Sequence, residues 1–321
     1  MAVTKRLAPV KDLFPGVRLT PAVKDLALWA YDHSEDDPGR VFVPKVNPDY
    51  IFQPEVLEVL VLSDVLNKPA YFFGHTGTGK TSHVVQFCAA RGKEVIRQNF
   101  DEAIGRAELI GSPIVAVDEG KQVVKFRRGS LITSAMRPST YIADEYDMGT
   151  SGATVLINPI LESESNPSIY VPETEEIIIP HKDWRVVATG NTDGVNADER
   201  GIYSGAQAQN MATLNRFAFR IEVKYNSKAQ EKKILDRKFI GFPSETMDKI
   251  LAFTTEYRKA FLQTMELSIP FSTRMLHNIC EATIMTGSVG KALHYTLLSS
   301  VPDAERRVVE ELAKRLGIDS E

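Results

Sequence analysis

The stretch FFGHTGTGKT, residues 72–81, follows an apolar run and places three glycines, three threonines and a lysine in one loop. It fits the pattern G-x-x-x-x-G-K-[ST], with Gly74, Gly79, Lys80 and Thr81 at the fixed positions. Glycines let the backbone turn sharply and bring its N–H groups close to an anion. The start of a following helix adds the positive end of its dipole. The stretch therefore predicts a phosphate-binding loop.

The sequence on either side of this loop supports the prediction. PAYFF at residues 69–73 is typical of a short buried strand, and TSHVVQFCAARG at residues 81–92 predicts a helix that Gly92 ends. A chance match in a glycine-rich turn would lack this context. Lys80 can reach the β- and γ-phosphates of a nucleotide, and the Thr81 hydroxyl can ligand Mg²⁺. The expected binding set for ATP and Mg²⁺ is Gly74, His75, Thr76, Gly77, Thr78, Gly79, Lys80 and Thr81.

Composition limits the class of protein. The chain has 321 residues, of which 43% are hydrophobic and 25% charged, as in ordinary globular proteins with a large core. The net charge of −4 does not favour nucleic-acid binding. We expect no membrane span, no signal peptide and a cytoplasmic location, because long apolar runs are missing and Cys88 and Cys280 form no disulfide framework.

The order of strand and helix patterns predicts three regions. Residues 1–48 look like an N-terminal arm with one helix at 20–33, residues 49–226 like an α/β nucleotide-binding domain, and residues 227–321 like a helical lid domain. In the second region strands alternate with helices, which indicates a parallel sheet. The expected strands are 71–73, 94–100, 140–145, 185–191 and 217–223. The expected lid helices are 227–239, 244–263, 273–287 and 303–317.

An acidic pair ends the third of these strands. STYIADEYD places Asp144 and Glu145 at the end of an apolar run. An aspartate there can hold the Mg²⁺ shell together with Thr81, and the adjacent glutamate can orient and deprotonate an attacking water. The alternative is a solvated acidic pair at a strand end. The phosphate-binding loop earlier in the chain favours the catalytic interpretation.

Three further residues complete a candidate catalytic set. Asn191 ends the strand RVVATGN and can position the water or touch the γ-phosphate. Arg216 lies just before the last strand, where a guanidinium suits a developing phosphoryl charge on a neighbouring subunit, with Arg220 in reserve. Arg274 lies near the start of a lid helix. Each has a plain alternative: a strand-capping turn for Asn191 and surface positions for the arginines.

This ordered set resembles the AAA+ superfamily. In that family's terms, residues 74–81 correspond to Walker A, Asp144 and Glu145 to Walker B, Asn191 to sensor 1, Arg216 to the arginine finger and Arg274 to sensor 2. The resemblance implies an αβα sandwich with a five-stranded parallel sheet and a C-terminal helical lid. It also implies a homo-oligomer, usually a hexameric ring, that hydrolyses ATP with Mg²⁺.

Finer features resemble the MoxR-like and metal-chelatase clade of that superfamily. Two candidate hairpins, residues 114–126 and 168–180, lie where the clade carries β-hairpin inserts. The segments NPDYIF, RAELIGSPIVAVDEGKQV, DEYDMG and NTDGVNADERGIYSGAQAQNMATLNRF resemble the ATPase small subunits of aerobic cobaltochelatases. The chain has Ser204 where that family usually carries histidine, and Asn215 where it usually carries an acid.

Three alternatives remain for the function of the chain and the partner on which it acts. The first is an ATPase that drives a protein client, namely the large cobaltochelatase subunit with a von Willebrand-type adaptor. The second is a MoxR-like chaperone that acts with a von Willebrand-type partner on another complex. The third is a nucleic-acid motor, for which Lys125, Arg127 and Arg128 offer only a short basic cluster. We expect the hairpin at 114–126 and the loop at 194–210 to contact the client.

Overall fold

A computed structural model describes residues 3–162, 167–195, 201–203 and 205–318 of the chain. The chain divides into two compact units. The first contains Met1–Asn47, Phe52–Gly74 and Lys80–Glu222, and the second contains Pro48–Ile51, His75–Gly79 and Val223–Glu321. No helix in the described ranges is long and apolar enough to cross a membrane.

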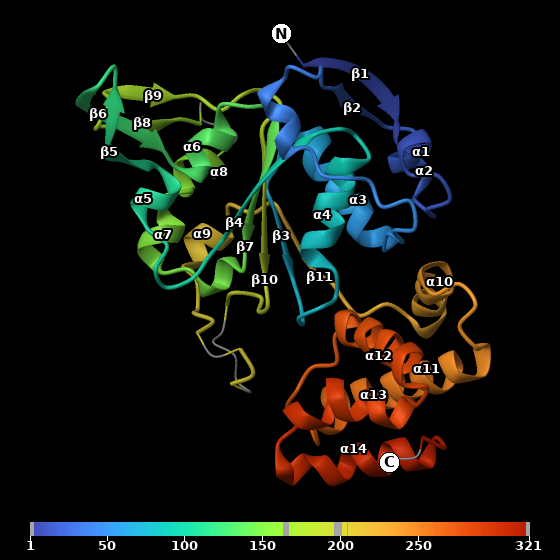
Figure 1. The fold of residues 1–321 in the computed structure, drawn as a ribbon. Coiled ribbons are helices and arrows are strands. Elements are labelled where there is room, and N and C mark those ends of the chain that lie inside the picture. Colours follow the sequence, from blue (N-terminus) through green and yellow to red (C-terminus); the bar gives the residue numbers. More distant parts are fainter. Residues whose placement is uncertain (1–2, 163–166, 196–200, 204, 319–321) are drawn as a thin grey trace. The chain divides into compact units, whose positions relative to one another are not determined.

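A five-stranded sheet forms the centre of the first unit, and all its strand pairs are parallel. Its order is β11 (Phe219–Glu222), β3 (Ala70–Phe73), β10 (Arg185–Gly190), β7 (Ser139–Asp144) and β4 (Glu94–Asn99). The predicted α/β fold with a five-stranded parallel sheet is confirmed. Because the strands are parallel, the residues that follow β3, β7 and β10 lie at one edge of the sheet (Figure 1).

Helices cover both faces of this sheet. Figure 1 shows α3 (Pro54–Leu66) and α4 (Lys80–Ala89) on one side. On the other side lie α6 (Ser130–Ala135), α7 (Ser151–Val155), α8 (Asn158–Leu161) and α9 (Met211–Leu214). The apolar cluster on that second side includes the buried rings of Tyr71, Tyr146 and Phe217, whose centroids lie 5.6 to 6.4 Å apart. This packing fixes the strands whose ends carry the predicted site.

The N-terminal segment differs from the prediction. β1 (Thr4–Pro9) pairs antiparallel with β2 (Ala27–Asp32), and α1 (Val10–Leu13), α2 (Pro21–Lys24) and η1 (Pro38–Phe42) are short. The predicted helix at 20–33 was therefore wrong. Its proline start is present in α2, but the following residues pair with β1 over six positions and bury Leu28 and Ala30 on one face. Tertiary strand pairing outweighs the local helical pattern.

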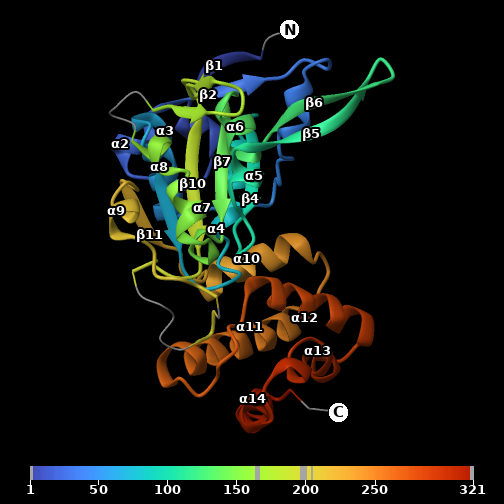
Figure 2. The ribbon, with the colours of Figure 1, turned by 90° about the vertical axis from the view of Figure 1, so that its left-hand side faces the viewer.

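Two hairpins extend from the first unit. β5 (Gly111–Asp118) pairs with β6 (Lys121–Arg128), and β8 (Ile169–Val171) pairs with β9 (Glu176–Ile178). Both hairpins were predicted. Glu119 and Gly120 between β5 and β6 have positive φ, as the tight two-residue hairpin turn requires. Figure 2 shows the β5–β6 ribbon extending beyond the sheet, and η2 (Tyr146–Met148) and α5 (Arg106–Leu109) complete the unit.

The second unit is helical. It contains α10 (Lys228–Lys238), α11 (Ser244–Lys259), the π-helical turn η3 (Ala260–Thr264), α12 (Thr273–Thr286), α13 (Val289–Thr296), η4 (Leu298–Ser300) and α14 (Asp303–Arg315). The four predicted lid helices are present, and α13 was missed. Phe253, Tyr257 and Phe271 form an aromatic core with ring centroids 5.2 to 6.2 Å apart.

Candidate nucleotide-binding site

The predicted phosphate-binding loop joins β3 to α4. Gly77 and Gly79 have φ of +75° and +93°, a backbone conformation that side-chain-bearing residues rarely adopt. Within the second unit, Tyr225 Oη donates to the Thr76 carbonyl at 3.2 Å, and the Thr273 amide donates to the Gly77 carbonyl at 3.4 Å. A Cβ on Gly77 would lie 2.2 Å from that of Ser272. Both the φ and this close approach require glycine at position 77.

Lys80 begins α4, and its side chain is buried in the first unit. Its Nζ donates to the Gly74 carbonyl at 2.6 Å and to Asn191 Oδ1 at 3.1 Å. Burial lowers the pKa of Lys80 to about 8, against the opposing influence of Asp147, Asp144 and Glu145. The ammonium therefore stays mostly charged at neutral pH. This ammonium contacts the carboxamide of Asn191, and the sequence predicted both residues for one nucleotide site.

Thr81 and Asp144 also meet. Thr81 Oγ1 donates to Asp144 Oδ1 at 2.6 Å, and the Thr189 hydroxyl donates to the same carboxylate oxygen. A threonine hydroxyl and an aspartate carboxylate are the hard oxygen donors that Mg²⁺ uses beside nucleotide phosphates. These residues therefore fit a magnesium ion that arrives with a nucleotide. Thr189, on β10, was not singled out from the sequence.

Glu145 follows Asp144 directly, and its side chain is exposed. Its backbone adopts the left-handed region, with φ of +54°, and its amide donates to Thr189 Oγ1 at 3.3 Å. The left-handed conformation is rare for a glutamate, and such conformations cluster where the surroundings enforce them. It turns the chain at the sheet edge, so that Asp144 is buried while Glu145 is exposed.

Asp147 anchors the turn that carries Asn191, and sequence reasoning missed it. Its Oδ2 accepts from the Asn191 amide at 2.9 Å, the Thr192 amide at 2.8 Å and Thr192 Oγ1 at 3.0 Å. Burial raises the pKa of Asp147, and the hydrogen bonds from Thr192 and Asn191 act in the opposite direction. The only signal in the sequence was a further acid three residues after Asp144, in DEYD.

The loop after Asn191 is tied to the same turn. The Gln207 amide donates to the Asp147 carbonyl at 2.8 Å, and the Gln209 amide donates to the Gly194 carbonyl at 2.8 Å. Gln209 Nε2 also donates to the Gly149 carbonyl at 3.3 Å. These bonds connect the predicted client loop to the segment after Asp144. Residues 196–200 and Ser204 of that loop lie outside the described residues.

The predicted arginines lie in different surroundings. Arg216 Nε donates to Glu162 Oε1 at 2.8 Å, and its Nη1 donates to the Ala212 carbonyl at 2.8 Å. The structure thus pairs Arg216 with Glu162 rather than with the Lys80–Asp144 group. Arg220 donates to the Asp193 carbonyl at 2.6 Å. Arg274 is exposed on α12 of the second unit.

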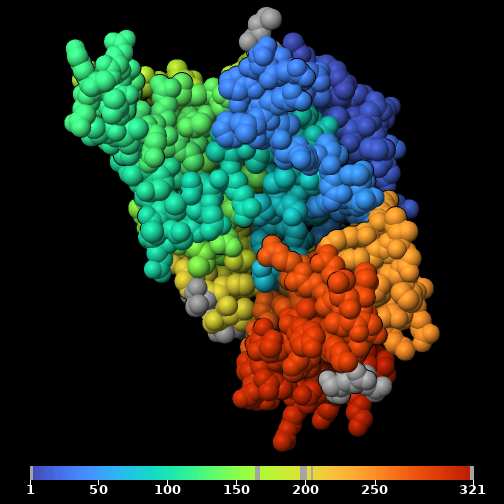
Figure 3. Space-filling view, viewed as in Figure 1, coloured from blue at the N-terminus to red at the C-terminus, as the bar shows by residue number. Residues whose placement is uncertain are grey.

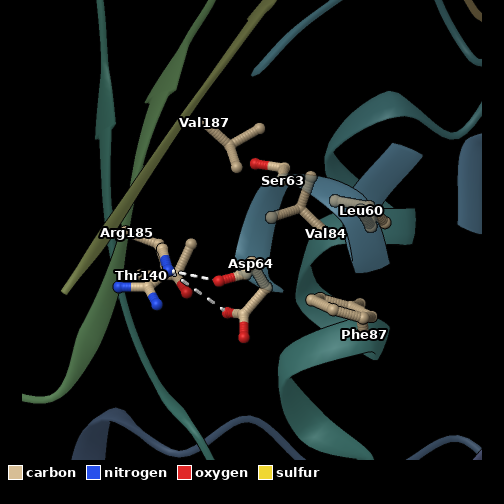
Figure 4. Close-up of a pocket in the computed structure, with 8 residues that line it drawn as sticks. All are labelled: Leu60, Ser63, Asp64, Val84, Phe87, Thr140, Arg185 and Val187. Carbon is tan, nitrogen blue, oxygen red and sulfur yellow. Dashed lines mark hydrogen bonds and ion pairs between the residues drawn. The ribbon is translucent and has the colours of Figure 1, made fainter. Parts of the chain in front are cut away.

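A second buried ionic group in the first unit surrounds Asp64. Arg91 donates to both oxygens of the Asp64 carboxylate at 2.8 and 2.9 Å, and Lys93 Nζ donates at 3.0 Å. Arg185 Nε donates to the Asp64 carbonyl at 2.9 Å, and Figure 4 shows this nitrogen facing Asp64. The adjoining cavity of about 10 Å³ has room for about one water molecule and not for a nucleotide. This group is structural.

His33, Asp37 and Glu94 also bring ligand-type atoms within 4.8 Å of one another. These side chains already bond to one another or to other protein groups. His33 Nδ1 lies 2.6 Å from Asp37 Oδ2, and Arg137 Nη2 donates to Glu94 at 2.9 Å. The ring's other nitrogen lies 2.9 Å from the Gly92 carbonyl oxygen. Because these atoms already have partners, the cluster ties η1 to β4 and gives no reason to expect a metal.

A known protein family matches the part of the chain that contains this candidate site. Residues 70–202 match the family described as "AAA domain (dynein-related subfamily)". Residues 70–202 are thus similar to AAA domains, in agreement with the resemblance that the sequence motifs carry.

The chain is also similar to several individual proteins. Over 300 residues the chain is 29% identical to aerobic cobaltochelatase subunit CobS of a Sinorhizobium species, which covers 92% of this chain and 88% of that protein. It is 29% identical over 178 residues to midasin of Dictyostelium discoideum, 54% of this chain but 3% of midasin. A mutant of Thermotoga maritima RuvB superposes with a TM-score of 0.49 and 13% identity, covering 86% of each chain.

Proposed function

We propose that this chain is an ATP-hydrolysing AAA+ protein that acts as an oligomer on a partner protein. Two sets of hydrogen bonds support this proposal. Lys80 donates to Gly74 and Asn191, and the adjacent Thr81 donates to Asp144. In our proposal Lys80 binds the β- and γ-phosphates and Asn191 positions the attacking water. The exposed Glu145 takes a proton from that water. Thr81 and Asp144 would hold Mg²⁺, and the ion would neutralise phosphate charge.

We further propose that the active site is completed by Arg216 of a neighbouring subunit in a ring. Within one chain this guanidinium pairs with Glu162, whose side chain is about half exposed. An ion pair this close to solvent contributes little and can be exchanged for a phosphate. Arginine fingers of this kind accelerate hydrolysis by roughly 10³- to 10⁵-fold in other nucleotide hydrolases.

Mixing two inactive variants tests the shared site. Arg216→Ala should bind ATP but barely release phosphate, and Lys80→Ala should fail to bind ATP. A mixture should recover part of the activity, because some interfaces then combine an intact loop with an intact finger. Arg106→Ala removes a half-exposed arginine from a surface ion pair with Glu173 and serves as the control. Full activity of Arg216→Ala alone would contradict the proposal.

We propose that the partner is a protein client, and the exposed apolar side chains of the two hairpins support this proposal. Val115 and Val124 are cross-strand neighbours on the β5–β6 hairpin and are 70% and 74% exposed. Tyr170 and Ile177 are likewise paired and exposed on β8–β9. Figure 3 shows the β5–β6 hairpin standing out at the upper left. Exposed apolar side chains grouped this way suit contact with another protein.

We propose a chelatase-type client in the cytoplasm, namely a large subunit with a von Willebrand-type adaptor. The likeness to a cobaltochelatase subunit supports the chelatase part of this proposal. The alternative is a MoxR-like chaperone for another complex. A nucleic-acid motor is less well supported, because Lys125 pairs with Asp118 and Arg128 with Glu176. Glu145→Gln loaded with ATP should retain the client, and ADP or Val124→Asp should release it. Nuclease-sensitive recovery of nucleic acid alone would favour the motor.

A further inference from the structure

Arg97 contacts the carboxylate that is proposed to hold magnesium. It lies on β4, and its guanidinium forms an ion pair with Asp144 Oδ2. The register of β4 and β7 explains the reach, because Arg97 lies opposite Ile142 and Asn99 lies opposite Asp144. Arg97 and Asn99 are two residues apart and so share a face of the strand. The long arginine side chain therefore extends along β4 toward the carboxyl edge of the sheet.

The two oxygens of Asp144 have different partners. Oδ1 accepts from the hydroxyls of Thr81 and Thr189, which are uncharged. Oδ2 has the charged partner, Arg97. The Asp144 side chain is only 4% exposed, and a buried carboxylate without a positive partner is strongly unfavourable. Arg97 thus supplies the positive charge that this carboxylate needs when no metal ion is bound.

The Arg97 side chain is free to move away from Asp144. It is 53% exposed, so its guanidinium can return to water without moving any strand. Lys80 differs, because its buried Nζ is held by Gly74 and Asn191. The half-exposed arginine is therefore the exchangeable cation beside Asp144.

We propose that Arg97 is a positioning residue that competes with Mg²⁺ for Asp144. It orients the carboxylate in the nucleotide-free protein and gives up Oδ2 when the metal arrives with ATP or ADP. This inference rests on the proposed nucleotide site. Competition for one ligand reduces the apparent metal affinity in proportion to the fraction of protein in which that ligand is free. Removal of the Arg97 charge should therefore strengthen the apparent binding of Mg²⁺.

The test measures the magnesium dependence of nucleotide binding. A fluorescent ADP analogue is titrated with magnesium chloride at constant ionic strength, using wild type, Arg97→Gln, Arg97→Lys and Arg106→Gln. The midpoint for Arg97→Gln should fall roughly fivefold, as expected for one partly exposed ion pair. Arg97→Lys keeps the charge and should stay nearer to wild type. Arg106→Gln makes the same charge change in the ion pair with Glu173 and should not move the midpoint.

The outcomes separate the two proposals. If wild type binds the analogue and the midpoint of Arg97→Gln is unchanged or higher, Arg97 does not compete with the metal and the inference fails. A higher midpoint for both Arg97 variants would mean that the arginine assists binding, which also contradicts it. If wild type binds no nucleotide with magnesium present, the proposed function fails first. Thermal melting of each variant verifies that it is folded.

Discussion

Asp64 and Asp144 are both buried carboxylates of the same unit with cationic partners, yet the two sites differ in accessibility. The cations that donate to the Asp64 carboxylate are Arg91 and Lys93, both almost fully enclosed. Burial alone would raise the pKa of Asp64, but the charges of Arg91 and Lys93 hold it well below its usual range. The cation on Asp144 is the half-exposed Arg97, and the remaining partners are hydroxyls.

This difference separates a structural ion cluster from a binding site. Around Asp64 the cations cannot leave without moving the fold, because Arg91 and Lys93 are enclosed in the connection between α4 and β4. Around Asp144 the sheet edge and a removable cation leave a carboxylate that can change its partner. Buried charge alone does not indicate function; an exchangeable partner at the carboxyl edge of a parallel sheet does.

The largest effect on stability should come from the structural cluster. Asp64→Asn leaves Arg91 and Lys93 buried without a counter-charge, and should lower the free energy of unfolding by about 3–5 kcal/mol. Urea unfolding followed by tryptophan fluorescence measures this directly, because Trp29 and Trp184 both lie in the first unit. Asp144→Asn is the matched control and should lose roughly 1 kcal/mol or less. Equal losses for the two variants would remove the distinction between the sites.

Asp147 lies between these two cases, because its Oδ2 accepts from backbone and hydroxyl donors rather than from cations. Asp147→Ala removes the acceptor for Asn191 and Thr192 and should cost about 1–3 kcal/mol of stability. Phosphate release should fall more than nucleotide affinity, because the altered group positions Asn191. Asp147→Asn keeps one acceptor oxygen and should retain more of both properties. Hydrolysis by Asp147→Ala at the wild-type rate would show that the anchor does not serve the reaction.

The smallest effect concerns the helical unit. Burial lowers the pKa of His277 to about 4, aided by Lys238 and opposed by Glu281. Between pH 6.5 and 4 the unfolded chain binds more protons than the folded one, so stability that is present above pH 6.5 is lost as the pH falls. Because His277 is partly exposed, we expect a loss on the order of 1 kcal/mol.

Far-UV circular dichroism during urea unfolding measures this loss at several pH values, and the tryptophans of the first unit provide a separate signal. His277→Phe should reduce the pH dependence of the helical transition and leave the tryptophan transition as it is in wild type. The same pH slope in both proteins would assign the effect to another group.

The sequence predicted the parts of the fold that depend on local pattern. Strand–loop–helix order at Lys80, an acidic pair after an apolar strand and a polar strand end at Asn191 are local signals, and the parallel sheet brings their positions together. Arg97 and Asp147 could not be found this way. Their contacts depend on the pairing of β4 with β7 and on a turn against β10, between segments distant in sequence. Helix α13 was missed because Gly290 weakens its helical signal.

The most direct test of the account compares two substitutions at the sheet edge for ATP affinity and phosphate release. Glu145→Gln should bind ATP with near wild-type affinity and release phosphate roughly 10²- to 10⁴-fold more slowly, because a carboxamide cannot take a proton. Lys80→Ala should lose ATP binding itself. Wild-type phosphate release by Glu145→Gln, or wild-type ATP affinity in Lys80→Ala, would contradict the claim that this edge is an ATP-hydrolysing site.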